Sequence, residues 1–124
     1  MIAVIGVDQS VRSRLEPLVK ALALEAVYFR SSGEFISSGR MRDARCIVVD
    51  AHISGMGGRQ LQSHLASSGR YIPMIFITST KDLKAREEAL RSGALDILRK
   101  PDGESAFIRE LASALRPGAS DTKK

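Results

Sequence analysis

The sequence predicts an α/β protein in which a doubly wound, five-stranded parallel sheet lies between two layers of helices. Three observations lead to this fold class. Short apolar runs alternate with amphipathic stretches five times along the 124 residues. The apolar runs are continuous rather than alternating, as expected for parallel strands buried on both faces. The connections are short, and repeated strand–helix alternation of this kind packs into three layers through right-handed crossovers.

The first two strand–helix units fall within residues 2–39. Residues 2–5 and 26–29 are short apolar runs that predict the first two strands. Between them, apolar side chains recur at helical spacing and predict an amphipathic helix: Val11, Leu15, Leu18, Val19 and Leu22. The segment 31–34 has the pattern of a capping box, so a short helix follows the second strand, and Gly39 ends it.

The third and fourth units repeat this order. Residues 46–49 and 74–77 predict the third and fourth strands. A helix follows each strand, and its leucines share one face: Leu61 and Leu65 in the first of these helices, Leu83 and Leu90 in the second. Gly93 then stops the second of these helices.

The last unit completes the domain. Residues 96–99 predict the fifth strand, and residues 104–116 predict a closing helix. Pro117 and Gly118 end that helix, because proline cannot continue it. We therefore expect one domain over residues 1–117 and a disordered tail or truncated linker over residues 118–124.

Composition narrows the class of protein further. A chain that is 44% hydrophobic and 27% charged has enough apolar residues for one closed core, and no apolar run approaches the length of a membrane span. The single cysteine, Cys46, excludes an internal disulfide. No secretory signal is visible, so we expect a cytoplasmic protein. The formal charge of +5 comes from dispersed Lys and Arg residues, which predict a solvated surface rather than direct nucleic acid binding.

Three of the predicted strands end on a reactive group. Asp50 closes the third strand, Thr78 the fourth and Lys100 the fifth. In an open parallel sheet the carboxyl ends of the strands meet at one edge, and ligands bind there. A carboxylate, a hydroxyl and an ammonium at this edge would form a site for phosphate groups. The first strand ends instead on Gly6 and Val7, which add no charge.

These strand ends, in this order and spacing, resemble the receiver domain of two-component response regulators. The similarity covers residues 2–116 and is greatest to receivers of the nitrogen-fixation-regulator type. The segments that carry it are residues 10–12, 55–58, 72–78 and 93–101. The resemblance implies a flavodoxin-like strand order 2-1-3-4-5 and a role in phosphorelay signal transduction rather than an enzymatic one.

The resemblance also implies a role for each strand-end residue. Asp50 would be the phosphoacceptor, because a carboxylate is an adequate nucleophile when cations neutralise the charge of the phosphoryl donor. Lys100 would pair with Asp50 and then with a phosphoryl oxygen, and Thr78 would bond the phosphoryl group as a switch residue. The donor would be a histidine kinase or phosphotransfer protein. Taken singly, each residue is better explained as an ordinary strand-end side chain; the three together favour the site.

The first departure from the family pattern concerns magnesium. The adjacent acidic pair that holds Mg²⁺ in receivers falls on Gly6 and Val7. The oxygen ligands that remain are the Asp50 carboxylate, the backbone carbonyl of His52 and Asp8, which is equally suited to cap the first helix. We therefore expect Mg²⁺ to bind at least about tenfold more weakly than in other receivers, or not at all.

The second departure is Ile97, which replaces the aromatic switch residue of the family. Two functions remain open: an atypical receiver with a weakened Mg²⁺ site, or a pseudo-receiver that acts as a phosphorylation-independent protein-interaction module. A downstream partner or second copy would dock on the last helix and strands, around Lys84, Arg86, Ile97, Arg99 and Ile108. No membrane contact is expected. A mononucleotide-binding enzyme is disfavoured, because no glycine-rich phosphate loop follows the first strand.

Overall fold

The computed structural model describes residues 1–50, 57–69, 72–78, 82–91, 93–96 and 101–115. Within these residues five parallel strands form one sheet in the order β2-β1-β3-β4-β5. The strands are β1 (Ile2–Ile5), β2 (Ala26–Phe29), β3 (Cys46–Asp50), β4 (Met74–Thr78) and β5 (Leu95–Asp96). The predicted fold class and strand order are confirmed.

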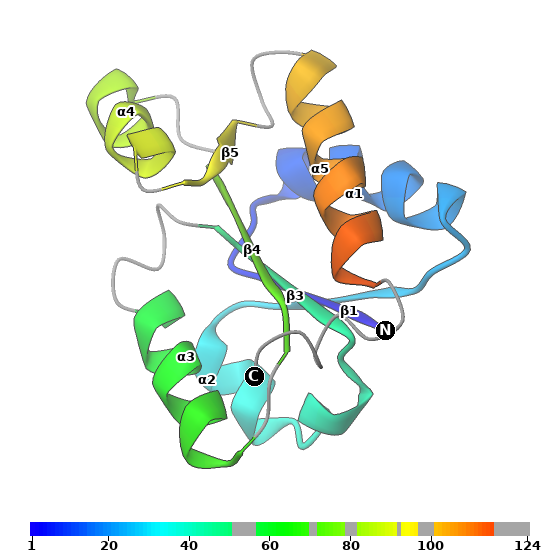
Figure 1. Cartoon of the computed structure of the whole chain (residues 1–124), viewed down its shortest axis with the longest axis vertical. Coiled ribbons are helices and arrows are strands. Elements are labelled where there is room, and N and C mark those ends of the chain that lie inside the picture. The colour runs from blue at the N-terminus through cyan, green and yellow to red at the C-terminus, as the bar shows by residue number, and fades with distance from the viewer. Residues whose placement is uncertain (51–56, 70–71, 79–81, 92, 97–100, 116–124) are drawn as a thin grey trace.

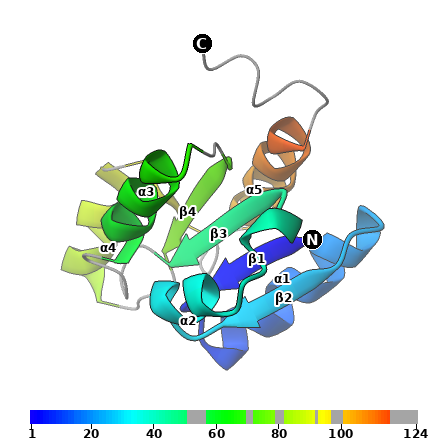
Figure 2. The ribbon, with the colours of Figure 1, turned by 90° about the horizontal axis from the view of Figure 1, so that it is seen from below.

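Helices lie on both faces of the sheet (Figures 1 and 2). Their bounds are α1 (Gln9–Ala21), α2 (Ser32–Ser37), α3 (Gly57–Ser67), α4 (Leu83–Arg91) and α5 (Pro101–Ala114), with a 3₁₀ turn η1 (Met41–Asp43) before β3. One face is covered by α1 and α5, and the other by α2 and α3. Helix α4 lies against β4 and β5. None of the helices within the described ranges is long and apolar enough to cross a membrane.

The core has two layers, one on each side of the central strands. Every residue of β1 and β3 is buried, which explains why their sequences are continuous apolar runs. Alternation along β1 sends Ile2 and Val4 into the layer beneath α1 and α5, and Ala3 and Ile5 into the layer beneath α2 and α3. The sheet is therefore held from both faces, and its carboxyl ends are fixed relative to one another.

The first two helices each begin at a side-chain cap. The Asp8 carboxylate accepts a hydrogen bond from the Val11 N–H at 3.0 Å and caps α1. Ser31 caps α2 by accepting from the Glu34 N–H at 3.1 Å, and the Glu34 carboxylate accepts from the Arg30 N–H in return. Both caps satisfy backbone donors that would otherwise have no partner within the helix.

The last helix and the last strand begin earlier than the sequence predicts. Helix α5 begins at Pro101, three residues before the predicted start at Glu104. Proline is well suited to the first position of a helix, because its missing N–H has no intrahelical acceptor there. Strand β5 begins at Leu95 rather than Asp96, and the rest of the predicted strand, residues 97–99, lies outside the described residues, as does the predicted tail.

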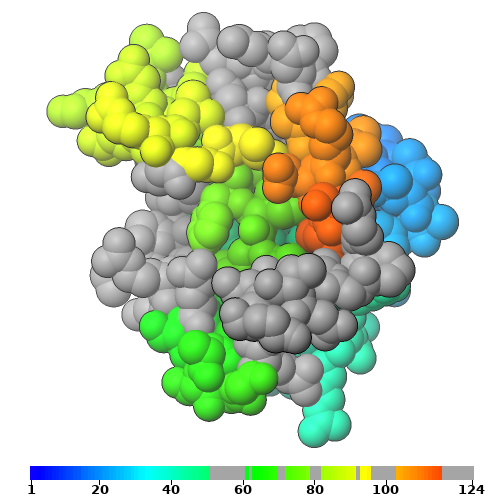
Figure 3. All heavy atoms as spheres, in the orientation of Figure 1, coloured from blue at the N-terminus to red at the C-terminus, as the bar shows by residue number. Residues whose placement is uncertain are grey.

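The orientation of α4 corrects the surface predicted for partners. Arg86, which was expected on that surface, is buried with 6% of its side chain exposed. Leu83 and Leu90 are exposed instead, at 62% and 39%. Figure 3 shows α4 at the margin of the molecule. Lys84 is exposed and Ile108 half-buried, while Ile97 and Arg99 lie outside the described residues.

Candidate functional site

Strand register brings the ends of β1, β3 and β4 together. Ile5 of β1 is paired with Val49, and Asp50 of β3 is paired with Ile77. Gly6 therefore follows β1 beside Asp50, and Thr78 lies one residue beyond the partner of Asp50. With strands about 4.8 Å apart and a rise of about 3.3 Å per residue, the Cα atoms of Asp50 and Thr78 lie roughly 6 Å from each other.

The two strand-end side chains are buried. Asp50 is 2% exposed and Thr78 is fully buried. Among the described residues, the Thr78 Oγ1 has no hydrogen-bond partner. A buried hydroxyl left in this state is destabilising by about 1–3 kcal/mol, so a hydrogen-bond acceptor arriving at this edge would be bound favourably. The Thr78 hydroxyl at the end of β4 thus has an open bonding capacity.

The end of β1 has a different character from the ends of β3 and β4. Gly6 adopts a left-handed backbone with φ of 77°, and its N–H donates to the Phe29 carbonyl at 2.9 Å. Val7 packs against the apolar layer beneath α1 and α5. The Asp8 carboxylate accepts from the Ser10 hydroxyl at 2.9 Å as well as from the Val11 N–H, so it is engaged at the start of α1.

A magnesium ion at this edge would need several oxygen ligands. Mg²⁺ requires near-octahedral oxygen ligation, usually with one or two carboxylates. Within the part of the chain that the structure describes, no group of three His, Cys, Asp or Glu residues could hold a metal ion. At the site edge, Asp50 is the last residue of β3 and Asp96 the last residue of β5, whereas Asp8 serves as a helix cap. The two residues after β1, Gly6 and Val7, supply no carboxylate to this edge.

Of the remaining residues predicted for the site, Lys100, Ile97 and His52 lie outside the described residues. The structure therefore brings together Asp50, Thr78 and the Gly6–Val7 turn, and leaves the other three assignments as predictions. The left-handed backbone at Gly6 was not predicted, although a glycine directly after a buried strand is a signal for it.

Two titratable side chains with shifted pKa values lie away from this edge. Burial raises the pKa of the Cys46 thiol, the first residue of β3, to about 12. Burial and then the nearby Glu16 carboxylate raise the pKa of Tyr28, while Arg12 opposes the shift. The Arg12 guanidinium carbon lies 4.0 Å from the centroid of the Tyr28 ring, a cation–π contact that ties α1 to β2. Both groups belong to the packing of α1 on the sheet.

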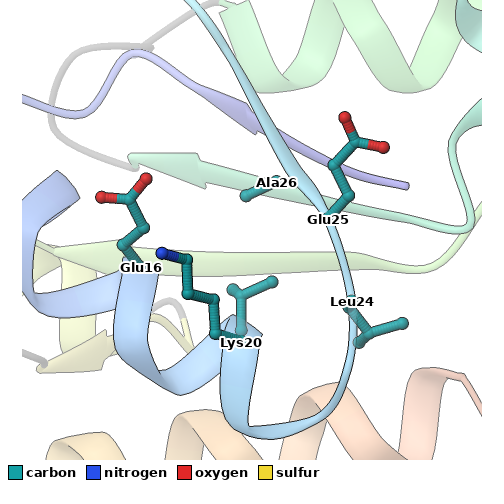
Figure 4. Close-up of a pocket in the computed structure, with 6 residues that line it drawn as sticks. Glu16, Lys20, Leu24, Glu25 and Ala26 are labelled. Carbon is teal, nitrogen blue, oxygen red and sulfur yellow. The ribbon is translucent and has the colours of Figure 1, made fainter.

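A shallow pocket lies at the opposite edge of the sheet. It has a volume of about 250 Å³ and is formed by the last turns of α1 and the start of β2 (Figure 4), with Glu16, Val19, Lys20, Leu24, Glu25 and Ala26 as its lining. Because α1 runs back across the sheet to the start of β2, this pocket lies at the amino ends of the strands. It is separate from the edge that holds Asp50 and Thr78.

The sequence pattern of the response regulator receiver domain matches residues 2–112. This chain belongs to the response regulator receiver family. The resemblance on which the roles of the strand-end residues depend is thereby confirmed at the level of the family, and the chain is a receiver domain of two-component signalling.

Named relatives agree with this assignment. Nodulation protein W of Bradyrhizobium diazoefficiens is 32% identical over 114 residues, which cover 92% of this chain and 50% of that protein. The transcriptional regulatory protein FixJ of Azorhizobium caulinodans is 30% identical over 121 residues, covering 98% of this chain and 57% of that protein. This receiver domain thus spans about half the length of these relatives.

Solved structures support the fold. A response regulator receiver protein from Burkholderia phymatum has a TM-score of 0.63 and 32% identity, with 92% of this chain and 93% of that chain covered. A receiver protein from Pseudoalteromonas atlantica has a TM-score of 0.66 at 22% identity, with coverages of 92% and 95%. At that lower identity the likeness concerns the fold alone.

Proposed function

We propose that this domain is an atypical receiver that accepts a phosphoryl group on Asp50 inefficiently and with weakened dependence on Mg²⁺. The observation that supports it most directly is the buried Thr78 hydroxyl, one residue beyond the strand neighbour of Asp50 and without a hydrogen-bond partner among the described residues. A phosphoryl oxygen on Asp50 would supply the missing acceptor.

The proposed reaction transfers a phosphoryl group from a nitrogen or oxygen atom of the donor to a carboxylate oxygen of Asp50. A carboxylate oxygen of Asp50 attacks phosphorus, the bond from phosphorus to the leaving group of the donor breaks, and an acyl phosphate forms. The donor would be a phosphohistidine of a kinase or phosphotransfer protein, or a small acyl phosphate. Thr78 would donate a hydrogen bond to a phosphoryl oxygen, and Lys100 would offset the negative charge.

Weakened magnesium dependence follows from the end of β1. Gly6 and Val7 supply no carboxylate, and Val7 is part of an apolar layer. In the same proposal Thr78 moves without an aromatic partner, because Ile97 replaces the usual switch residue. The phosphorylated form would then change the surface around α4 and β5 less than in receivers with that aromatic side chain.

A second function is favoured by the same turn at the end of β1. Gly6 has a left-handed backbone, and Val7 packs against the apolar layer beneath α1 and α5. Such residues are compatible with a domain that does not depend on metal-assisted phosphorylation. This alternative is a pseudo-receiver that binds a partner through its surface regardless of phosphorylation. The two functions differ in whether Asp50 ever carries a phosphoryl group.

Intact-mass measurement after incubation with acetyl phosphate separates them. We expect a substoichiometric single phosphoryl adduct, with a yield that Mg²⁺ changes by less than about tenfold. Asp50→Ala should abolish the adduct, and Thr78→Ala should reduce it. A stoichiometric adduct that requires Mg²⁺ would show an ordinary receiver. The absence of any adduct, with and without the metal, would establish the pseudo-receiver.

Restoring a carboxylate tests the magnesium part of the proposal. Val7→Asp should tighten Mg²⁺ binding by at least about tenfold in calorimetric titration, because a second acid joins Asp50. Val7→Asn is the matched control, since it has the same shape without the charge. Gly6→Asp is the less clean variant, because a side chain at φ of 77° strains the backbone by about 1 kcal/mol. Equal Mg²⁺ affinity in Val7→Asp and Val7→Asn would refute a ligand role for position 7.

A further inference from the structure

The pocket at the amino ends of the strands has an apolar floor that backbone hydrogen bonds hold in place (Figure 4). Val19 is buried, and Leu24 and Ala26 pack against the apolar layer beneath α1 and α5. The Leu24 N–H donates to the Val19 carbonyl at 3.2 Å. The Ile2 N–H donates to the Glu25 carbonyl at 2.8 Å. These bonds fix the turn from α1 into β2, so the pocket is formed in advance and little ordering would oppose the binding of a ligand.

Three charged side chains lie on the rim of this pocket: Glu16, Lys20 and Glu25. All three are exposed, and none of them forms an ion pair with another of the described residues. Glu16 and Lys20 are four residues apart on the same side of α1, whereas Glu25 extends from the other side of the pocket (Figure 4). A carboxylate and an ammonium are thus available on adjacent turns of one helix, next to an apolar surface.

A further polar group close to the pocket lacks a partner. Tyr28 lies two residues beyond Ala26 on the same face of β2, and its hydroxyl is buried without a hydrogen-bond partner among the described residues. Burial raises the pKa of Tyr28, and the nearby Glu16 carboxylate adds to this effect. Polar groups of a ligand beside Glu16 would therefore enter a region whose hydrogen-bonding capacity is not fully used.

We propose that this pocket binds a free α-amino acid with an apolar side chain. The ammonium of the amino acid binds the Glu16 carboxylate, its carboxylate binds the Lys20 ammonium, and its side chain covers the apolar floor. The pocket volume of about 250 Å³ is sufficient for a molecule of the size of leucine. Because the pocket lies at the edge of the sheet opposite Asp50, this binding stands apart from the function proposed for that residue.

Charge complementarity is the reason for choosing this ligand. A simple amine or a peptide amino terminus would bring a positive charge close to Lys20 without a carboxylate to offset it, and a carboxylic acid would bring a negative charge close to Glu16 and Glu25. A zwitterion satisfies both signs. An ion pair between Glu16 and Lys20 themselves would be exposed and weak, so the ligand loses little by replacing it. Because the pocket is shallow, we expect a dissociation constant on the order of 1 mM.

Titration of the whole chain with L-leucine, followed through amide chemical shifts in two-dimensional NMR, tests the ligand. We expect saturable shifts concentrated in residues 16–26. Three analogues should each bind at least about fivefold more weakly: leucinamide, which lacks the carboxylate and represents a peptide amino terminus, N-acetylleucine, which lacks the ammonium, and glycine, which lacks the apolar side chain. The absence of saturable shifts up to about 50 mM leucine, or equal affinity for leucine and leucinamide, would refute the proposal.

Substitutions on the rim test which group of the ligand each residue recognises. Lys20→Gln should abolish the preference for leucine over leucinamide without weakening the binding of leucinamide. Glu16→Gln should abolish the preference for leucine over N-acetylleucine in the same way. Glu87→Gln, on the exposed surface of α4, is the matched control and should change neither preference. A variant that merely disturbed the fold would weaken all ligands alike, and that result for Lys20→Gln would overturn the assignment.

Discussion

Helices α1 and α4 have comparable apolar periodicity in sequence but opposite relations to the core. Helix α1 buries its spaced apolar residues Val11, Leu15 and Val19. Helix α4 buries Arg86 and exposes its two leucines. The difference follows from what lies beneath each helix: α1 packs on the layer formed by the fully buried strands β1 and β3, whereas α4 lies at the margin, against β4 and the two described residues of β5. Periodicity identifies residues that share a face; the neighbouring layer determines which face turns inward.

The largest expected difference between the two regions is in cysteine reactivity. Cys46 lies in the layer beneath α1, where burial raises its pKa from 9.0 to about 12, so its thiolate fraction at pH 8 is about a thousandfold lower than that of an unperturbed thiol. A cysteine introduced by Glu87→Cys on α4 should therefore react at least a thousandfold faster with a disulfide reagent. Stopped-flow absorbance of the released thiol measures both rates. Comparable rates would show that the layer beneath α1 opens readily.

The same shift gives a pH dependence of stability with a defined sign. The folded state favours the neutral thiol, so the unfolded chain loses its proton first, near pH 9. The contribution of Cys46 is fully present below pH 9 and falls as pH rises towards 12, by up to about 1.4 kcal/mol per pH unit. Urea unfolding of the protein and of Cys46→Ala across pH 8–10.5 isolates this contribution as the difference between the two curves. A difference that is constant with pH would contradict the assigned shift.

Truncation of a leucine should destabilise the protein much more in α1 than in α4. Leu15→Ala removes a fully buried side chain from α1 and should lower the free energy of unfolding by about 2–5 kcal/mol. Leu83→Ala on α4 should change it by less than about 0.5 kcal/mol, because the side chain is 62% exposed. Denaturant titration measures both changes. A large loss for Leu83→Ala would mean that α4 packs inward in solution.

Much of the fold could be predicted from the sequence because its signals are local. Continuous apolar runs mark β1 and β3, and Asp8 and Ser31 mark helix starts through hydrogen bonds to backbone groups only three residues away. The burial of Arg86 could not be predicted in this way. It depends on which side of α4 meets β4 and β5, and the spacing of Leu83 and Leu90 is equally compatible with either side.

Part of the candidate site could be predicted from the sequence, and part could not. Asp50 and Thr78 were recognisable because each closes a buried strand, and parallel register then places them at one edge. The left-handed turn at Gly6 depends on the hydrogen bond from its N–H to the Phe29 carbonyl of the neighbouring strand, which no local pattern contains. The sequence left two roles open for Asp8, a helix cap or a metal ligand. Its side chain caps α1 in the structure, and this depends on the direction in which the chain leaves the turn at Gly6.

Removal of the cap tests how strongly the start of α1 is anchored next to the site. Asp8→Ala should destabilise the protein by about 1 kcal/mol, since the Val11 N–H loses its acceptor. Asp8→Asn keeps an acceptor and should retain most of the stability, whereas a residue that served chiefly as a metal ligand would show the same loss of Mg²⁺ affinity in both variants. Thermal unfolding, with and without Mg²⁺, records both effects. Equal stability of all three proteins would show that the cap is absent in solution.

The smallest expected effect concerns the ion pair that joins α1 to α5. Both Nε and a terminal nitrogen of Arg14 donate to Oε2 of Glu104, at 2.9 and 2.6 Å, but about a third of each side chain is exposed. Solvent screening therefore limits the contribution to about 0.2–1 kcal/mol, and Glu104→Gln should lower the free energy of unfolding by no more than that at low ionic strength. The loss should shrink in about 1 M salt, where the Debye length falls to about 3 Å. Asp43→Asn, which breaks the more exposed Arg40–Asp43 pair, is the matched control and should have still less effect. A loss that persists in high salt would mean that Glu104 acts through packing beside α1, which would sharpen the contrast between α1 and α4.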